Sequence, residues 1–341
     1  MKIISKYLKL LPVFIMVLGL TACSDDDDNN GPGVQTTTVV DVAVANGFDA
    51  LAAALVRADL VTTLEGPGPF TVFAPTDDAF QDLLDTDPTW NSVNDIPLDL
   101  LTNVLLNHVI IGDNIASSEL INLGSGYATT GATGPSNTNL SLYFNVDGGT
   151  VELNGGFDTS AGADVTTADV EATNGVVHVI NKVLLPPTVV DMAIANDDFS
   201  SLVASLLEAD GSTADPMYVA TLSGTGPFTV FAPNNAAFQA LLDSNMMWNS
   251  PADIDDALLN AVLAHHVVVG NNVQSGDLTP NGTTSPTTLQ GQTIDITLPG
   301  TNGNIADVVD GAGNDAGIIA VDVQTSNGVI HVVNAVLLPA S

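Results

Sequence analysis

One segment of eight residues occurs twice in this chain of 341 residues. Residues 68–75 read GPFTVFAP, and residues 226–233 repeat them without change. An identical repeat of this length is improbable by chance, so the chain is interpreted as a duplication. The duplication predicts two structured domains and assigns most other notable residues to equivalent pairs. It also argues against a single active site, because most candidate residues occur twice.

The N-terminus predicts a secretion signal rather than part of the fold. Three lysines within the first nine residues precede an apolar run at residues 10–20, which is too short to cross a membrane and is typical of a signal peptide. Leu-Thr-Ala-Cys at residues 20–23 resembles the cleavage box of bacterial lipoproteins. The resemblance implies a signal peptide over residues 1–22, cleavage before Cys23 and lipidation of Cys23. The alternative is an ordinary signal peptide followed by an incidental cysteine.

Residues 23–38 are predicted to be an acidic, flexible tether. They contain four consecutive aspartates followed by Asn, Gly and Pro, and they offer nothing to bury. Acidic residues directly after a lipidated cysteine resemble the export signal of surface lipoproteins in Bacteroidetes-type bacteria, although a plain acidic spacer would have a similar composition. The resemblance implies a protein anchored by lipid to the outer membrane, on the cell surface of a Gram-negative bacterium.

The charge of the chain beyond Cys23 is strongly negative. Only Arg57 and Lys182 oppose 39 acidic residues there, which gives a net charge of −37. Such a surface repels a phosphate backbone, so nucleic acid is excluded as a partner. The acids are 34 Asp and 5 Glu, and Asp favours turns and helix N-caps but also binds calcium. A solvated, soluble surface is the preferred interpretation, and a dedicated cation role is the alternative.

Both copies, at residues 39–186 and 187–341, show the same order of expected elements. A helix comes first, and FTVF then reads as a short buried strand. Thr76 and Asn234 follow as N-caps of a second helix. A third helix ends in histidine, and the rest of each copy is rich in short strands. Only Pro187 and Thr188 lie between the Leu-Leu-Pro that ends the first copy and the Val-Val-Asp repeated in the second, which predicts a semi-rigid tandem.

A hairpin is expected to close each copy. Asn174-Gly175 and Asn327-Gly328 stand between runs of β-branched residues. Asn-Gly in this setting is a strong signal for a two-residue turn. The segments that differ between the copies, among them residues 127–139, are predicted to carry recognition.

Three ordered blocks, each present in both copies, resemble fasciclin-like domains. They are residues 69–80 and 227–238, the helix ends at His108 and His266, and residues 174–186 and 327–339. The resemblance implies an α+β fold class with two tandem fasciclin-like domains, each a β-sandwich or wedge with several packed helices. Where the family usually has tyrosine before the motif histidine, this chain has Asn107 and His265. The receptor role of that tyrosine in some animal members is therefore not carried over.

The resemblance also implies extracellular adhesion or matrix binding, in a family with no established common catalytic activity. We expect a non-enzymatic adhesion lipoprotein that contacts extracellular matrix, polysaccharide or another cell, with the membrane reached through the lipid anchor. The partner would be an extracellular protein or polysaccharide ligand.

Four family-motif histidines, His108, His178, His266 and His331, are interpreted as hydrogen-bonded core residues because their sequence neighbours are apolar. The alternative is a metal- or small-molecule-binding module that uses these His-bearing blocks. No catalytic, cofactor-binding or metal-ligating residue is assigned. Residues 307–315 contain oxygen ligands and glycines but lack EF-hand spacing, so a surface turn is expected and a calcium loop is the alternative.

Overall fold

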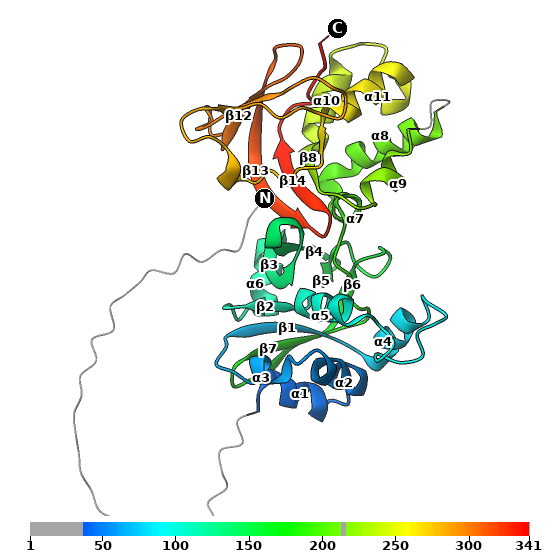
Figure 1. Cartoon of the computed structure of the whole chain (residues 1–341), viewed down its shortest axis with the longest axis vertical. Helices are drawn as coiled ribbons and strands as arrows, with labels where there is room; N and C mark the ends of the chain where they lie inside the picture. Colours follow the sequence, from blue (N-terminus) through cyan, green and yellow to red (C-terminus); the bar gives the residue numbers. More distant parts are fainter. Residues whose placement is uncertain (1–36, 213–215, 341) are drawn as a thin grey trace, which may run out of the picture.

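The computed structural model describes residues 37–212 and 216–340, which form two bodies stacked along the long axis of the molecule (Figure 1). Cys23 and nearly all of the predicted tether lie outside the described residues. Within the described ranges, no helix combines the length and the apolar character that spanning a membrane requires.

In the first body most helices lie in the N-terminal half and most strands in the C-terminal half. Its helices are α1 Val39–Ala45, α2 Asp49–Arg57, α3 Val61–Leu64, α4 Asp77–Leu84, α5 Leu98–Asn107, α6 Ser117–Leu123 and the 3-10 turn η1 Pro135–Asn137. Its strands are β1 Phe70–Pro75, β2 Val109–Ile111, β3 Ser125–Thr133, β4 Asn139–Asp147, β5 Thr150–Leu153, β6 Ala163–Ala172 and β7 Gly175–Ile180.

The second body repeats this plan. Its helices are α7 Val189–Ala195, η2 Asp197–Phe199, α8 Ser200–Gly211, α9 Tyr218–Leu222, α10 Asn235–Asp243, η3 Pro251–Asp253, α11 Asp256–His265 and η4 Ser275–Asp277. Its strands are β8 Phe228–Pro233, β9 Val267–Val269, β10 Thr283–Thr284, β11 Asp295–Thr297, β12 Ala306–Val309, β13 Asp315–Thr325 and β14 Gly328–Val333.

Each body is built on one seven-stranded sheet. The strand orders are β2-β1-β7-β6-β5-β4-β3 and β10-β11-β12-β13-β14-β8-β9. The pairs β1–β7 and β8–β14 are parallel, and all other neighbours are antiparallel. In the first sheet the edge strands β2 and β3 contact each other, so the sheet curls almost to closure. The predicted α+β class and the tandem arrangement are confirmed.

The last six residues of the repeated octapeptide, Phe70–Pro75, form a buried strand, as expected. Phe70, Val72 and Ala74 pack against the helices, whereas Phe73 lies in a separate apolar cluster inside the curl. Successive side chains of a strand point to opposite faces, so a strand between two cores needs a continuous apolar run. The predicted caps that follow are also confirmed: Thr76 accepts from the Ala79 amide, and Asn234 accepts from the Ala237 amide.

The closing hairpins exist, but their turns differ from the expected Asn-Gly geometry. In the first domain Ala172 pairs with Gly175, so the turn residues are Thr173 and Asn174. Asn174 instead bridges elements: its amide donates to the carbonyls of Leu64 and Gly66, and its side-chain oxygen accepts from the Val39 amide.

Gly175 is required by a close backbone approach and not by a turn. A methyl group built on it would lie 2.2 Å from the carbonyl oxygen of Phe70, and the same group on Gly328 would lie 2.3 Å from that of Phe228. Asn327 repeats the bridge of Asn174, reaching the carbonyls of Leu222 and Gly224. The Asn-Gly pair therefore locks the parallel strand pair to the helices.

The two domains contact each other through both apolar packing and hydrogen bonds. Tyr127 packs with the core of the second domain, and its hydroxyl accepts from the Asn196 amide group at 2.9 Å. The Gln324 amide donates to the Ser141 hydroxyl at 3.1 Å. Tyr127 is thus part of an intramolecular interface, and the expectation that residues 127–139 carry recognition stays a prediction. The contacts restrain the two domains relative to one another.

Candidate functional site

His108 and His266 end equivalent helices and are fully enclosed. The ring Nδ1 of His108 donates to the Val104 carbonyl at 2.7 Å, and its Nε2 accepts from the Leu184 amide at 2.8 Å. His266 makes the same two bonds, with Val262 at 2.8 Å and Leu337 at 2.9 Å. Each histidine therefore ties a helix end to the last segment of its domain.

The environment of these two rings favours the neutral form. Burial lowers the pKa of His108 to about 4, and the hydrogen bond to Val104 opposes this only in part. The pKa of His266 is also lowered to about 4 by burial. A neutral ring with one donor and one acceptor matches the carbonyl and the amide that it meets. Neither ring keeps a free nitrogen for a metal or a substrate.

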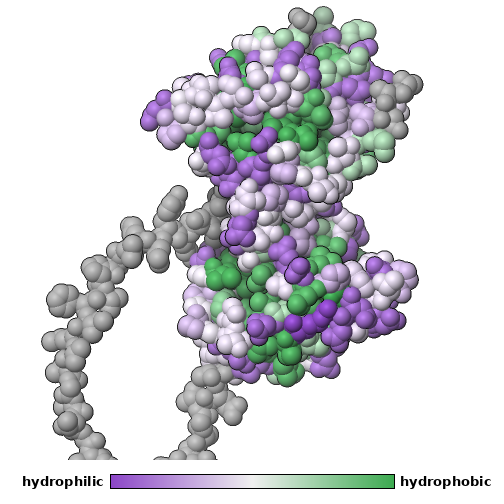
Figure 2. Space-filling view, in the orientation of Figure 1, coloured by the Kyte–Doolittle hydropathy of each residue, from purple (hydrophilic) through white to green (hydrophobic). Residues whose placement is uncertain are grey.

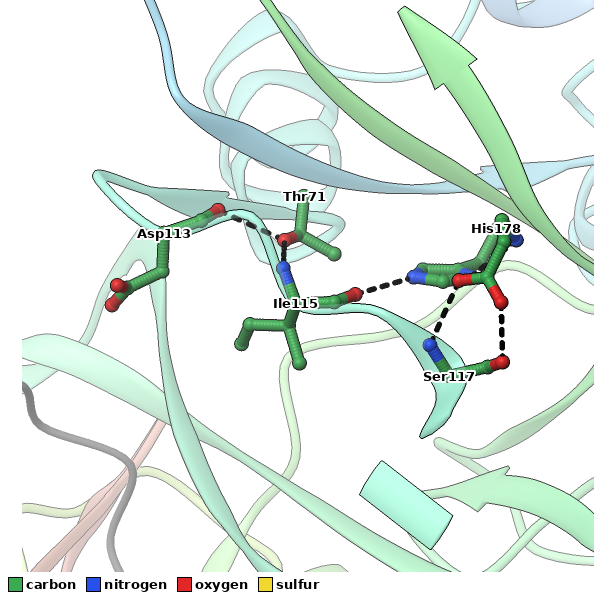
Figure 3. A network of polar contacts seen from close by, with 6 residues as sticks. Thr71, Asp113, Ile115, Ser117 and His178 are labelled. Carbon is green, nitrogen blue, oxygen red and sulfur yellow. Dashed lines mark hydrogen bonds and ion pairs between the residues drawn. The ribbon is translucent and has the colours of Figure 1, made fainter. Parts of the chain in front are cut away.

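His178 and His331 lie on the strands β7 and β14 and bridge to the segments that follow β2 and β9. His178 Nε2 donates to the Ile115 carbonyl at 2.9 Å, and its Nδ1 accepts from the Asp169 amide at 3.2 Å (Figure 3). His331 has the corresponding bonds to Val273 at 2.8 Å and to Asp322 at 3.4 Å. Burial lowers the pKa of both histidines.

A hydroxyl and a carboxylate complete the network around His178. The Thr71 hydroxyl donates to the Asp113 carbonyl and accepts from the Ile115 amide, both at 2.9 Å (Figure 3). The Ser117 amide and hydroxyl donate to the carboxylate of Asp169. Burial raises the pKa of that carboxyl, but the two bonds from Ser117 outweigh it and hold the pKa below the ordinary value.

The second domain repeats this network residue by residue. The Thr229 hydroxyl donates to the Asn271 carbonyl and accepts from the Val273 amide, both at 2.9 Å. Ser275 donates to Asp322 through its amide and its hydroxyl. The family-motif histidines are therefore engaged in hydrogen bonds in both domains. Within a domain, the helix-end histidine and the strand histidine bond to different backbone groups.

The residues that replace the family's tyrosine are also committed to the fold. The Asn107 amide group donates to the carbonyls of Leu184 and Leu185. His265 Nε2 accepts from the Gly311 amide at 3.1 Å, and its Nδ1 lies 3.2 Å from the Thr288 hydroxyl. Both side chains are fully buried. Among residues 37–212 and 216–340, no group of three or more His, Cys, Asp or Glu side chains is placed to hold a metal ion.

Within the segment 307–315, residues 310–314 form the connection between β12 and β13. The carboxylate of Asp310 accepts from the Asn314 amide at 2.7 Å and from the Leu338 amide at 2.8 Å. Asp310 is largely buried, and its oxygens are directed at these donors. The loop is thus closed by internal hydrogen bonds that attach it to the C-terminal segment.

The second domain contains an apolar cavity of about 390 Å³ that no sequence pattern indicated. Helices α10 and α11 line it together with the turn before α11, the 310–314 loop and residues 338–340. These elements lie side by side at one end of the molecule (Figure 1). The helical residues Leu241, Leu258 and Val262 form much of the lining. The sequence shows these positions only as a helical stripe, which is equally typical of a filled core.

Comparison with known domain families assigns this chain to a family. A model described as the fasciclin domain matches residues 46–186 and again residues 199–339. The chain belongs to the fasciclin domain family. Each match covers all seven strands of one sheet, and the histidine networks described above lie within the matched ranges, whereas α1 and α7 lie before them. The domain limits at 39–186 and 187–341 stay a prediction.

Relatives with fasciclin domains include cell-surface proteins. Human periostin is 30% identical over 285 residues, which is 82% of this chain but 29% of periostin. The cell surface glycolipoprotein MPB83 of Mycobacterium bovis is 32% identical over 147 residues, covering 43% of this chain and 59% of that protein. A solved FAS1 domain pair from the insect cell adhesion molecule fasciclin I has 21% identity and a TM-score of 0.49, covering 87% of this chain and 95% of that one. The chain thus spans under a third of periostin and over half of MPB83.

Proposed function

We propose that this chain is a non-enzymatic binding protein, held by lipid on Cys23 at the outer surface of a Gram-negative bacterium. The observation that carries the proposal is the engagement of the motif histidines. In His108 and His266 both ring nitrogens are hydrogen-bonded to backbone, so the residues best suited to acid–base or metal chemistry hold the fold instead. Recognition is left to the surface.

The charge distribution is consistent with a role outside the cell. It argues against nucleic acid as a partner. Residues 187–341 carry 16 acidic residues and no Lys or Arg. In the first domain the two cations are used internally: Arg57 donates to the Val93 carbonyl, and Lys182 donates to the carbonyls of Phe157 and Thr159. Hydrophilic side chains surround the apolar ones that reach the surface (Figure 2). The proposed ligand is an extracellular protein or polysaccharide.

The name of one relative adds support for the location. MPB83 is described as a cell surface glycolipoprotein and matches this chain over 147 residues. Lipidation at Cys23 would place two domains beyond a tether of about 15 residues, and such a tether is long enough to lift the domains clear of a membrane surface.

Protease treatment of intact cells tests the proposal. An added protease should remove the epitope of the wild-type protein while a periplasmic marker stays intact. A Cys23→Ala variant should lose membrane association, because its lipid attachment site is gone. Complete protection of the wild-type protein on intact cells, with digestion only after lysis, would contradict the surface location. A Cys23→Ala variant that still partitions with the membrane would contradict the lipid anchor.

A further inference from the structure

The cavity of the second domain opens beside two methionines that face the solvent. The turn between α10 and η3 contains Ser244 and Trp248, which both line the cavity, and Met246 and Met247 lie between them. Met246 is 100% exposed and Met247 is 78% exposed. Exposed methionines are flexible and polarizable, and they are frequent on surfaces that adapt to apolar ligands. They are not lining residues themselves, but they stand between two of them in the chain.

The fold does not require these methionines. The equivalent turn of the first domain has Pro88 and Thr89 before Trp90. The two turns make the same bonds: the Thr89 amide donates to Asp87 Oδ1 at 2.8 Å, and the Met247 amide donates to Asn245 Oδ1 at 3.0 Å. A turn of the same geometry therefore carries polar or small side chains in one domain and two exposed apolar chains in the other. Exposed apolar groups next to a cavity indicate a binding surface.

The exposed charges next to the cavity lining are negative, and they indicate the charge of the ligand. Four exposed aspartates neighbour the lining in sequence: Asp243, Asp253, Asp255 and Asp256. The second domain has no Lys or Arg to attract an anion. A second copy of this chain would bring a like charge to the contact and is disfavoured. A cationic ligand with a bulky apolar group satisfies both the rim and the cavity.

We infer that the cavity binds a basic peptide segment of a partner protein, with one aromatic or large aliphatic side chain inserted between α10 and α11. Met246 and Met247 cover the inserted side chain, and the lysines or arginines on either side of it meet the aspartates of the rim. A cavity of about 390 Å³ has room for one such side chain. The inference rests on the proposed binding function and names the chemistry of the partner.

The test measures binding of fluorescein-labelled peptides to the purified mature chain at low salt. The probes are Lys-Ser-Lys-X-Lys-Ser-Lys with Trp, Phe or Leu at X. Their controls have Ala at X, or Glu in place of every Lys. We expect at least one probe to bind more tightly than both of its controls, and its affinity to fall as salt rises.

Two matched double variants locate the site. Met246→Pro with Met247→Thr installs the residues of the first domain and should weaken binding roughly tenfold, because the apolar cover is lost. Pro88→Met with Thr89→Met in the first domain should leave binding unchanged. An unchanged unfolding midpoint in both variants confirms that the turn still folds.

Three results would overturn the inference: no probe binds at about 1 mM peptide, the Ala control binds as well as the Trp probe, or the Met246→Pro/Met247→Thr variant binds like the wild type. These outcomes are independent of the location of the protein. A chain that is digested on intact cells but binds no probe would leave the proposed surface function standing and remove only the peptide site.

Discussion

The loop between β5 and β6 and the loop between β12 and β13 occupy equivalent places in the two domains but contact different parts of the molecule. In the first domain the 154–162 loop reaches the second domain, where the Ser160 hydroxyl donates to Asp191 at 2.6 Å. In the second domain the 310–314 loop folds onto its own C-terminal segment, where the Ala312 amide donates to the Leu338 carbonyl and the Leu338 amide donates to Asp310. One loop joins the domains, and the other forms a wall of the apolar cavity. The same scaffold position thus serves assembly in one copy and a binding surface in the other.

The largest effect is expected where the copies are identical. Gly175→Ala and Gly328→Ala should each destabilise their own domain by at least about 3 kcal/mol, since a methyl group cannot fit 2.2 Å or 2.3 Å from a backbone carbonyl oxygen. Each domain has one Trp, so urea unfolding of Trp90→Phe and Trp248→Phe backgrounds reports the domains separately. Gly276→Ala is the control, because a methyl group there meets nothing within 4 Å. Unequal losses of unfolding free energy in the two domains would show that the two glycines are not equivalent.

The buried histidines should make both domains sensitive to acid in the same pH range. The folded pKa of His108 and of His266 is about 4, and the ordinary value is 6.5. The unfolded chain therefore binds protons that the folded chain refuses, so stability is complete above about pH 6.5 and falls as the pH drops towards 4. The loss should reach about 3 kcal/mol for each histidine.

Urea unfolding at pH 7 and pH 5 checks this sensitivity. His108→Gln should lower the stability of the first domain and also flatten its dependence on pH, while the second domain keeps its own. His266→Gln should do the reverse. If a variant kept the full pH dependence, other groups would be responsible for it.

The smallest effect concerns a residue that only the first domain has. Lys182 donates to the Thr159 carbonyl at 2.6 Å and to the Phe157 carbonyl at 3.1 Å, and so holds the 154–162 loop. Lys182→Ala should cost about 1 kcal/mol and separate the unfolding of the two domains, because the loop also contacts α7. The equivalent residue of the second domain is Ala335, and Ala335→Lys should give no gain in stability. Wild-type cooperativity in Lys182→Ala would remove this role for the loop.

The repeat made much of the fold predictable. The octapeptide contains a short run of β-forming residues, so a buried strand was the natural interpretation, and the caps at Thr76 and Asn234 followed from their side chains. The helix-end histidines lie on an apolar stripe, which indicated a core position. The predicted position of the hairpin turn, at Asn174 and Gly175, was wrong by one residue. The sequence shows the Asn-Gly signal but not the carbonyl of Phe70 that approaches Gly175.

The cavity and the domain junction could not be predicted in the same way. Leu241, Leu258 and Leu338 are far apart in sequence, and apolar residues at helical spacing fill a core far more often than they line a cavity. Likewise, the sequence placed Tyr127 in a variable loop, but its hydroxyl accepts a hydrogen bond from Asn196 across the junction. Such contacts depend on how two elements pack, and hydrophobic periodicity reports only which face of each element is apolar.

The sequence by itself determined the duplication, the fasciclin domains, the excess of acid and the order of elements, because each of these is written in local patterns or in composition. The tertiary structure decided which polar side chains are consumed by the fold and which surfaces stay open. His108 and its partner at Leu184 are 76 residues apart, and only the packed chain brings the ring nitrogen to that amide. Long-range hydrogen bonds and cavities arise from packing between distant segments, so they appear only when the chain is folded.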